Sequence, residues 1–140
     1  MRFLIIVKAT KESEAEVVPN PEEKLMAAMA TYHEELAKAG ALLDGSGLHP
    51  SSKGWRIKYS GEKRTVVDGP FAETKELIAG YTMIQVKSRE EALEWTKRFP
   101  NPAGEGKVAE IEVRQLYELE DFAPSESVER FREMELGKKK

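Results

Sequence analysis

Cysteine is absent from this chain of 140 residues. Its absence excludes a thiol nucleophile, a disulfide framework, zinc-finger ligation and iron–sulfur clusters, and it is typical of proteins in a reducing compartment. Long apolar runs are lacking too, since the longest strongly apolar stretch covers residues 3–7. A signal-peptide core needs about 7–15 apolar residues and a membrane span about 20. We therefore expect an unexported, cytoplasmic protein without a membrane partner.

An excess of one charge is also lacking. The chain has 22 Lys and Arg residues against 25 Asp and Glu residues, which gives a formal net charge of −3, and both signs are interspersed. This balance does not favour nucleic acid as a partner. The length suits one domain, which can bury about two thirds of its unfolded surface without a structural metal. His33 and His49 are the two histidines, so we expect no dedicated metal site and assign no cofactor.

Apolar patterning predicts a strand followed by a helix in the first part of the chain. Residues 2–9 begin with a nearly continuous apolar run, which is typical of a central strand. The following helix is predicted to start with Asn20 as N-cap and Pro21 in its first position, and to end at Gly40. Three- and four-residue spacing predicts its inward stripe. The stripe consists of Leu25, Met26, Met29, His33, Leu36 and Ala37.

The rest of the pattern supplies further strands and a second helix. Residues 41–43 predict a short strand that the segment 44–47 breaks, and this segment is flexible enough for a bulge or a close backbone approach. Alternating residues predict an inserted hairpin over 55–59 and 63–67. A capping box starts the second helix, which ends before a proline. The remaining predictions are a strand at 80–87, the capping box Ser88–Glu91, the helix stop at Pro100 and a last strand at 108–119.

This order of elements predicts an α+β fold: a ferredoxin-like βαββαβ sandwich with an inserted β-hairpin and both helices on one face of the sheet. Two helices cannot cover the large residues on the other face, among them Tyr81 and Met83. We therefore expect a second copy to cover that face and form a symmetric homodimer, a dimeric α+β barrel.

Residues 121–140 are expected to form a C-terminal extension after a domain at 1–120. Ser125 is predicted to cap a short helix that carries Val128, Phe131 and Leu136 on one side and ends at Gly137, before a frayed lysine tail. We expect this amphipathic helix to dock on its own domain or on the dimer partner.

The segment Asp68–Glu76 contains the most specific pattern. Gly69 tolerates a positive φ, Pro70 fixes the exit direction, and the Asp68 carboxylate can accept hydrogen bonds from the amides of the turn. A rigid corner is expected, with Phe71 anchoring it in the core. Asp68 is then either part of a structural turn or a pocket carboxylate that acts as a general base or holds a substrate cation.

The nine residues Asp68-Gly69-Pro70-Phe71-Ala72-Glu73-Thr74-Lys75-Glu76 resemble the signature of the DGPF branch of YCII-related proteins. The resemblance implies a ferredoxin-like fold that dimerises through its sheets as an α+β barrel. In the wider YCII-related group a His and an Asp have been suggested as a catalytic pair, some barrel relatives degrade aromatic or chlorinated compounds, and bacterial DGPF members are often linked to extracytoplasmic-function sigma factors. Further similar positions are residues 2–8, 34–36, 39–40, 47–48, Pro50, Gly80, 91–92, Trp95, Pro100 and 112–114.

His33 is the natural partner for Asp68, because its place on the inward stripe turns it towards the sheet, where an imidazole can relay protons at neutral pH. The alternative is a histidine that only satisfies core hydrogen bonds. We take His33 and Asp68 as the candidate catalytic pair. The candidate substrate-binding residues are Tyr32, Ser46, Glu73 and Arg114.

Two functions remain open. The first is an enzyme or binder of a small-molecule ligand, with a pocket between helix and sheet near the dimer seam and His33 and Asp68 in acid–base roles. The second is a non-catalytic dimeric module of sigma-factor or stress-response regulation, in which the Asp68 turn is only architecture. The distance between His33 and Asp68 in the fold discriminates between them.

Overall fold

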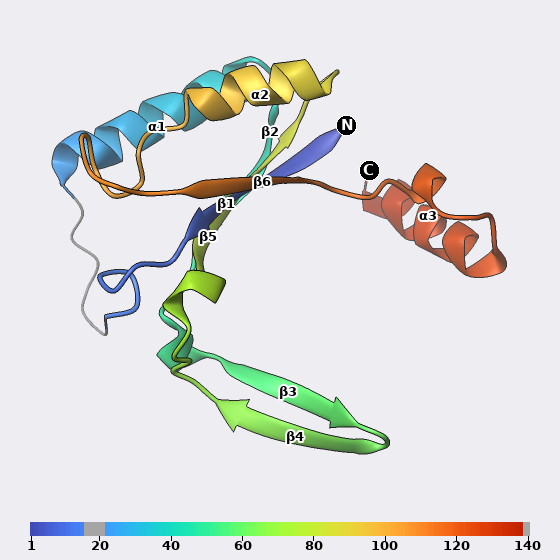
Figure 1. The fold of residues 1–140 in the computed structure, drawn as a ribbon. Coiled ribbons are helices and arrows are strands. Elements are labelled where there is room, and N and C mark those ends of the chain that lie inside the picture. The colour runs from blue at the N-terminus through green and yellow to red at the C-terminus, as the bar shows by residue number, and fades with distance from the viewer. Residues whose placement is uncertain (16–21, 139–140) are drawn as a thin grey trace.

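The computed structural model describes residues 1–15 and 22–138 and contains a four-stranded sheet. All its strand pairs are antiparallel, in the order β2-β5-β1-β6. Both long helices of the first 100 residues lie on one face of this sheet (Figure 1). This is the ferredoxin-like arrangement, so the predicted fold class is confirmed. The elements are β1 (Arg2–Lys8), α1 (Glu23–Lys38), β2 (Leu42–Gly47), β5 (Ile78–Gln85), α2 (Arg89–Lys97) and β6 (Ile111–Gln115).

The core lies between the sheet and the two helices. β1 and β5 bury alternate residues on this side, and Ile5, Leu36 and Ile84 are fully buried. This period of two is the pattern expected of strands with one covered face. The core residues are Phe3, Ile5, Tyr32, Leu36, Ala41, Ile84, Val86 and Ala92, with Leu42, Trp95, Phe99, Ile111 and Val113 packed against them.

The inward stripe of α1 differs from the prediction. Tyr32 and Leu36 are buried, whereas Met26 and Ala37 are exposed. The Tyr32 ring makes edge contacts with Trp95 and Phe99, so α1 packs sideways against the second helix as well as down onto the sheet. Glu22 is the N-cap and makes no side-chain capping bond. The predicted cap at Asn20 and Pro21 lies outside the described residues.

Two strands have other bounds than expected. β2 runs through residues 44–47, because these pair with β5 up to Gly47 opposite Gly80, and the irregularity falls between Leu42 and Asp44. The predicted break was therefore wrong, and the irregularity lies just before the segment in which a bulge was predicted. β6 is shorter than residues 108–119, since its pairing with β1 covers only residues 111–115. The cap of α2 is as predicted, with Ser88 Oγ accepting the Glu91 amide at 3.1 Å.

The inserted hairpin and the C-terminal helix both lie apart from the sandwich. β3 (Trp55–Ser60) and β4 (Lys63–Asp68) form a separate two-stranded sheet, which lies below the main sheet in Figure 1 while α1 and α2 lie above it. Beyond β6 come η3 (Leu119–Asp121) and α3 (Glu126–Lys138). Ser125 Oγ accepts the Val128 amide at 3.1 Å, which confirms the cap. The helix continues past Gly137, the predicted end.

The turn after β4 is held by backbone packing against η1 (Ser51–Lys53). The Gly69 amide donates to Gly54 O at 3.0 Å, and the Phe71 amide donates to Ser51 Oγ at 3.0 Å. Gly69 does not have a positive φ. A Cβ placed on it would lie 1.9 Å from Ser51 O, so close approach is what requires glycine here.

Phe71 does not anchor the turn in the core, contrary to the prediction. Its ring is partly exposed and lies under the Arg56 guanidinium, 3.8 Å from the ring centroid. A cation over an aromatic face is attracted by the ring quadrupole. This contact ties the turn to β3 rather than to the main core.

We expect Gly69→Ala to lower the free energy of unfolding by about 1–3 kcal/mol, because the added methyl group forces the backbone away from Ser51. Gly54→Ala is the matched control, since its Cβ would have its nearest neighbour at 3.6 Å, an ordinary contact. Urea denaturation of the two variants measures the difference. Equal losses would show that close packing is not what requires Gly69.

Candidate functional site

His33 is hydrogen-bonded at both ring nitrogens. Nδ1 lies 2.7 Å from Met29 O on its own helix, and Nε2 lies 2.8 Å from Thr82 Oγ1 on β5. A carbonyl oxygen only accepts, so Nδ1 carries the hydrogen and Nε2 of the neutral ring accepts from the threonine hydroxyl. The backbone of α1 thereby sets the tautomer, and Thr82, which is buried, orients the ring.

The imidazole occupies the seam between α1 and the β2–β5 side of the sheet. Gly45 of β2 leaves space beside it, because a Cβ there would lie 3.8 Å from His33 Cδ2. Edge contacts to Tyr32 and Phe99, with ring centroids at 5.7 and 6.2 Å, enclose the ring from the helix side. His33 thus faces the sheet, as its position on the stripe predicts.

Asp68 is exposed at the base of the hairpin, opposite Trp55 in the strand register. Its carboxylate makes no hydrogen bond or ion pair in the part of the chain that the structure describes, since the nearby amides of Gly69 and Phe71 donate elsewhere. The expected bonds from the turn to this carboxylate are absent. The hydrogen bonds that hold the turn therefore do not involve the Asp68 carboxylate.

Within one chain, His33 and Asp68 do not contact each other. The hydrogen bonds of His33 go to Met29 and Thr82, and in Figure 1 the helices and the hairpin lie on opposite sides of the main sheet. The catalytic role of this pair stays a prediction.

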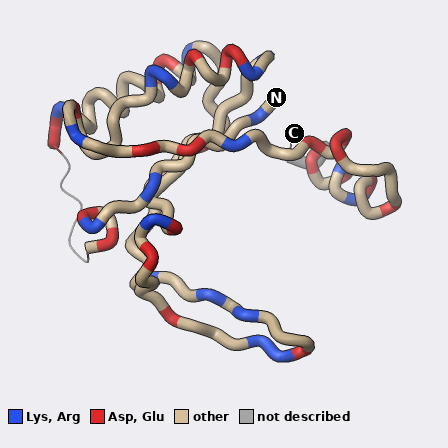
Figure 2. Tube along the Cα trace, viewed as in Figure 1, with Lys and Arg blue, Asp and Glu red and all other residues tan. Residues whose placement is uncertain are grey.

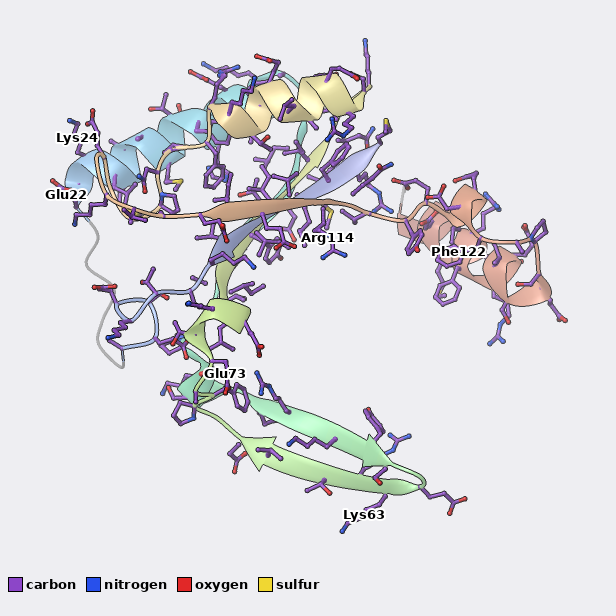
Figure 3. The ribbon with its side chains drawn as sticks, in the orientation of Figure 1. Glu22, Lys24, Lys63, Glu73, Arg114 and Phe122 are labelled. Carbon is purple, nitrogen blue, oxygen red and sulfur yellow. The ribbon has the colours of Figure 1, made fainter. Side chains whose placement is uncertain are left out.

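Two of the expected substrate-binding residues lie in very different places. Tyr32 is 4% exposed, and its hydroxyl donates to Trp95 O at 2.6 Å. Burial raises the pKa of the Tyr32 phenol to about 12. Glu73 is exposed near the base of the hairpin (Figure 3), just before the short turn η2 (Thr74–Glu76). Tyr32 is thus a core residue and Glu73 a surface residue.

Ser46 and Arg114 share the face of the sheet that is turned away from the helices, which we call the open face. Figure 3 shows Arg114 on the side of β6 away from α1 and α2. The strand register arranges this face in two rows across β2, β5, β1 and β6. They are Asp44–Met83–Leu4–Arg114 and Ser46–Tyr81–Ile6–Glu112. Ser46 and Arg114 therefore stand at opposite edges of the same surface.

The open face has an apolar centre between polar edges. At the β2 edge, the Tyr81 hydroxyl donates to Asp44 Oδ2 at 2.9 Å, and this bond together with the Asp44 charge raises the pKa of Tyr81. At the β6 edge, Lys8 and Arg114 pair with Glu112 at 3.1 and 3.2 Å and lower the pKa of its carboxyl. These arrangements keep a phenol protonated on one edge and a carboxylate ionised on the other.

The Asp44–Tyr81 pair is missing from the residues predicted from sequence. The predicted strand stopped before Asp44, so the period of two was not carried on to this residue. The signal was present nevertheless: Ser46, two residues further on, was chosen, and residues i and i+2 of a strand share a face. Extending the strand by four residues would have found it.

A hollow of about 450 Å³ lies between the start of α1 and residues 100–105, and neither His33 nor Asp68 lines it. Within residues 1–15 and 22–138, no group of three or more His, Asp and Glu side chains is placed to hold a metal ion. None of the described helices has the length and apolar character needed to cross a membrane.

Removing the Thr82 hydroxyl tests the His33 seam. We expect Thr82→Val to lower the free energy of unfolding by about 1–3 kcal/mol, because it leaves Nε2 of His33 without its partner. Thr65→Val, an exposed change on β4, serves as the control and leaves stability nearly unchanged. Urea denaturation measures both. A Thr82→Val protein as stable as the control would mean that this bond contributes nothing.

Stability at alkaline pH reports on Tyr32. Its folded pKa of about 12 lies above the unfolded value near 10, so its contribution is complete below pH 10 and is lost as the pH rises towards 12. Urea denaturation from pH 9 to 11 should show a shallower decline for Tyr32→Phe than for the unmodified chain. Tyr59→Phe, at an exposed tyrosine, should keep the steeper decline. Identical slopes for all three proteins would contradict the assignment.

Comparisons with known proteins place the chain in a family. The YCII-related domain matches residues 1–117. The uncharacterized protein R00369 of Rhizobium meliloti (strain 1021) is 31% identical over 80 residues, which are 57% of this chain and 64% of that protein, less than two thirds of its length. A solved structure of 5-chloro-2-hydroxyhydroquinone dehydrochlorinase from Burkholderia phenoliruptrix AC1100, in complex with 2,5-dihydroxybenzoquinone, is similar over 84% of this chain and 94% of that chain, with 17% identity and a TM-score of 0.41. Because the domain match covers most of its length, the chain belongs to the YCII-related family.

Proposed function

We propose that this protein is a homodimer that packs two open faces together and binds a small molecule between them. The observation that carries the proposal is the open face itself. Leu4, Ile6 and Met83 are partly exposed at its centre, and both helices of the sandwich lie on the other side of the sheet. An apolar surface of this kind is favourable to cover.

The charges of the open face make it complementary to itself. Asp44 stands at one end of a row and Arg114 at the other end. A twofold axis between the sheets and parallel to the strands places Arg114 of one copy opposite Asp44 of a second copy, while the apolar centres meet. Opposite charges at both edges favour this orientation over its alternatives.

The enclosed polar groups indicate the class of ligand. Covering the open face takes the hydroxyls of Tyr81 and Ser46 and the carboxylate of Asp44 out of water. Both hydroxyls already donate within the chain, to Asp44 and to Gly47 O, so the oxygens of these groups are left to accept hydrogen bonds from a ligand. A flat ring can lie on Leu4 and Met83, and polar substituents can reach the Tyr81–Asp44 pair. The site therefore suits a small aromatic or cyclic molecule that carries hydroxyl or similar groups.

The acid–base part of the proposal rests on His33. Its Nε2 accepts from Thr82 when the ring is neutral and donates to the same oxygen when it is protonated, so a proton can be held there without moving the ring. Asp68 does not contact His33 in one chain. Because His33 lies on the helix side of the sheet beside Gly45 of the edge strand β2, pairing of the two residues requires the hairpin of a second copy to reach around this edge.

The second candidate function is a non-catalytic dimeric module of sigma-factor or stress-response regulation. The observation that favours it is the packing of Gly69 against Ser51, which accounts for the turn while the Asp68 carboxylate has no partner among the described residues. In this case the homodimer is retained, but no small molecule is bound.

Native mass spectrometry tests the homodimer first. We expect a dimer at micromolar concentration and a shift to monomer in Leu4→Glu, which puts a charge at the centre of the open face. Leu93→Glu is the matched control, because Leu93 is exposed on α2, the far side of the sandwich, and this variant should stay dimeric. A monomeric unmodified chain would overturn the proposal.

The same spectra test the ligand. We expect a retained molecule, or one taken up from a set of hydroxylated ring compounds, that is lost in Asp44→Asn and Tyr81→Phe and kept in Tyr59→Phe. A dimer that takes up none of these compounds favours the regulatory module. If one of these compounds is converted by the protein, the acid–base role predicts that His33→Gln still binds the compound but no longer converts it. An unchanged rate of conversion in His33→Gln would exclude this role.

A further inference from the structure

The hairpin presents an uncovered apolar face. Trp55, Ile57 and Tyr59 alternate along β3 and so share one side, with Val66 paired opposite Ile57. Their exposed fractions are between 44% and 66%. An isolated two-stranded hairpin is at best marginally stable in water. Contact with a second surface would therefore stabilise this hairpin.

The hairpin is also basic. Residues 55–68 contain four basic and two acidic residues, a net charge of +2, and Figure 2 shows Lys and Arg on both of its strands. Arg56 and Arg64 lie over the rings of Phe71 and Tyr59. Within the described residues, Lys58 and Lys63 make no ion pair.

Residues 118–135, which we call the acidic extension, have the opposite character. They contain seven acidic and two basic residues, a net charge of −5, and three lysines end the chain after them. Phe122, Phe131 and Met134 are about half exposed, at 48%, 57% and 56%. Glu126 and Glu133 make no ion pair in the described part of the chain. A helix as short as α3, with 13 residues, is marginal alone.

Within one chain these two surfaces do not meet. In Figure 1 the hairpin and α3 point away from the sandwich as separate arms. Glu118 binds Arg2 of β1, and Arg132 pairs with Glu120 and Glu129 within the extension. Each chain has one of each surface, which is the requirement for two equal contacts about a twofold axis.

We propose that the hairpin of one copy packs against the acidic extension of a second copy, and the reverse. The aromatic face of β3 would cover Phe131 and Met134, while Arg64, which pairs with Tyr59 and so shares that face, lies near the carboxylate of Glu135, one turn after Phe131 on α3. The contact rests on the proposed homodimer and adds to it a segment that lies beyond the family match at residues 1–117.

The lack of cysteine allows a direct test. One chain carries Lys63→Cys near the hairpin turn, and a second, differently tagged chain carries Glu133→Cys on α3. The two are co-expressed and treated with a short bismaleimide. We expect cross-linked product that contains both tags, several-fold more than from Lys63→Cys with Glu90→Cys, a matched exposed position on α2.

The outcomes distinguish failure of the proposed hairpin–extension contact from failure of the proposed homodimer. A native dimer that gives no more product than the Glu90→Cys control would overturn the contact and leave the homodimer in place. A monomer would overturn both. As an independent check, Arg64→Glu should raise the dissociation constant of the dimer by up to about fivefold per contact, and Glu135→Lys in the same chain should restore it. Failure of this restoration would also count against the contact.

Discussion

Both helices of the sandwich lie on one face of the four-stranded sheet, and the remaining features follow from this one-sided cover. On the covered side, alternate residues of β1 and β5 are buried to make the core. The same alternation places Leu4 and Met83 as neighbours on the other side. An antiparallel sheet tolerates an open face, but an apolar centre framed by opposite charges is better suited to contact with a second copy.

Paired strands β2 and β5 carry hydrogen-bonded polar groups on both faces of the sheet. Thr82 turns towards the helices and binds His33, while its neighbour Tyr81 turns to the open face and binds Asp44. Gly45 leaves room for the imidazole on one side, and Asp44 beside it carries the carboxylate on the other. Because these groups belong to adjacent residues of two paired strands, a shift of either strand moves both sites together.

Sequence patterns predicted the features that depend on near neighbours. The caps at Ser88 and Ser125, the hairpin and the alternation on β5 all follow from spacing over a few residues. The burial of Tyr32 was not predictable in this way, because it depends on where α2 packs against α1. Nor could spacing show that the sheet lies between His33 and Asp68, since that is a property of the tertiary fold.

The turn at Asp68–Phe71 positions the base of the hairpin. Glu14 accepts hydrogen bonds from the amide and hydroxyl of Ser51, and Ser51 in turn accepts from the Phe71 amide. This chain of bonds fastens the base of the hairpin to the segment that follows β1. Gly69 allows the close approach, so the turn sets the direction of the hairpin. If the hairpin contacts a second copy, residues of this motif act on assembly through that direction, and substitutions there should change dimer stability before they change any chemistry.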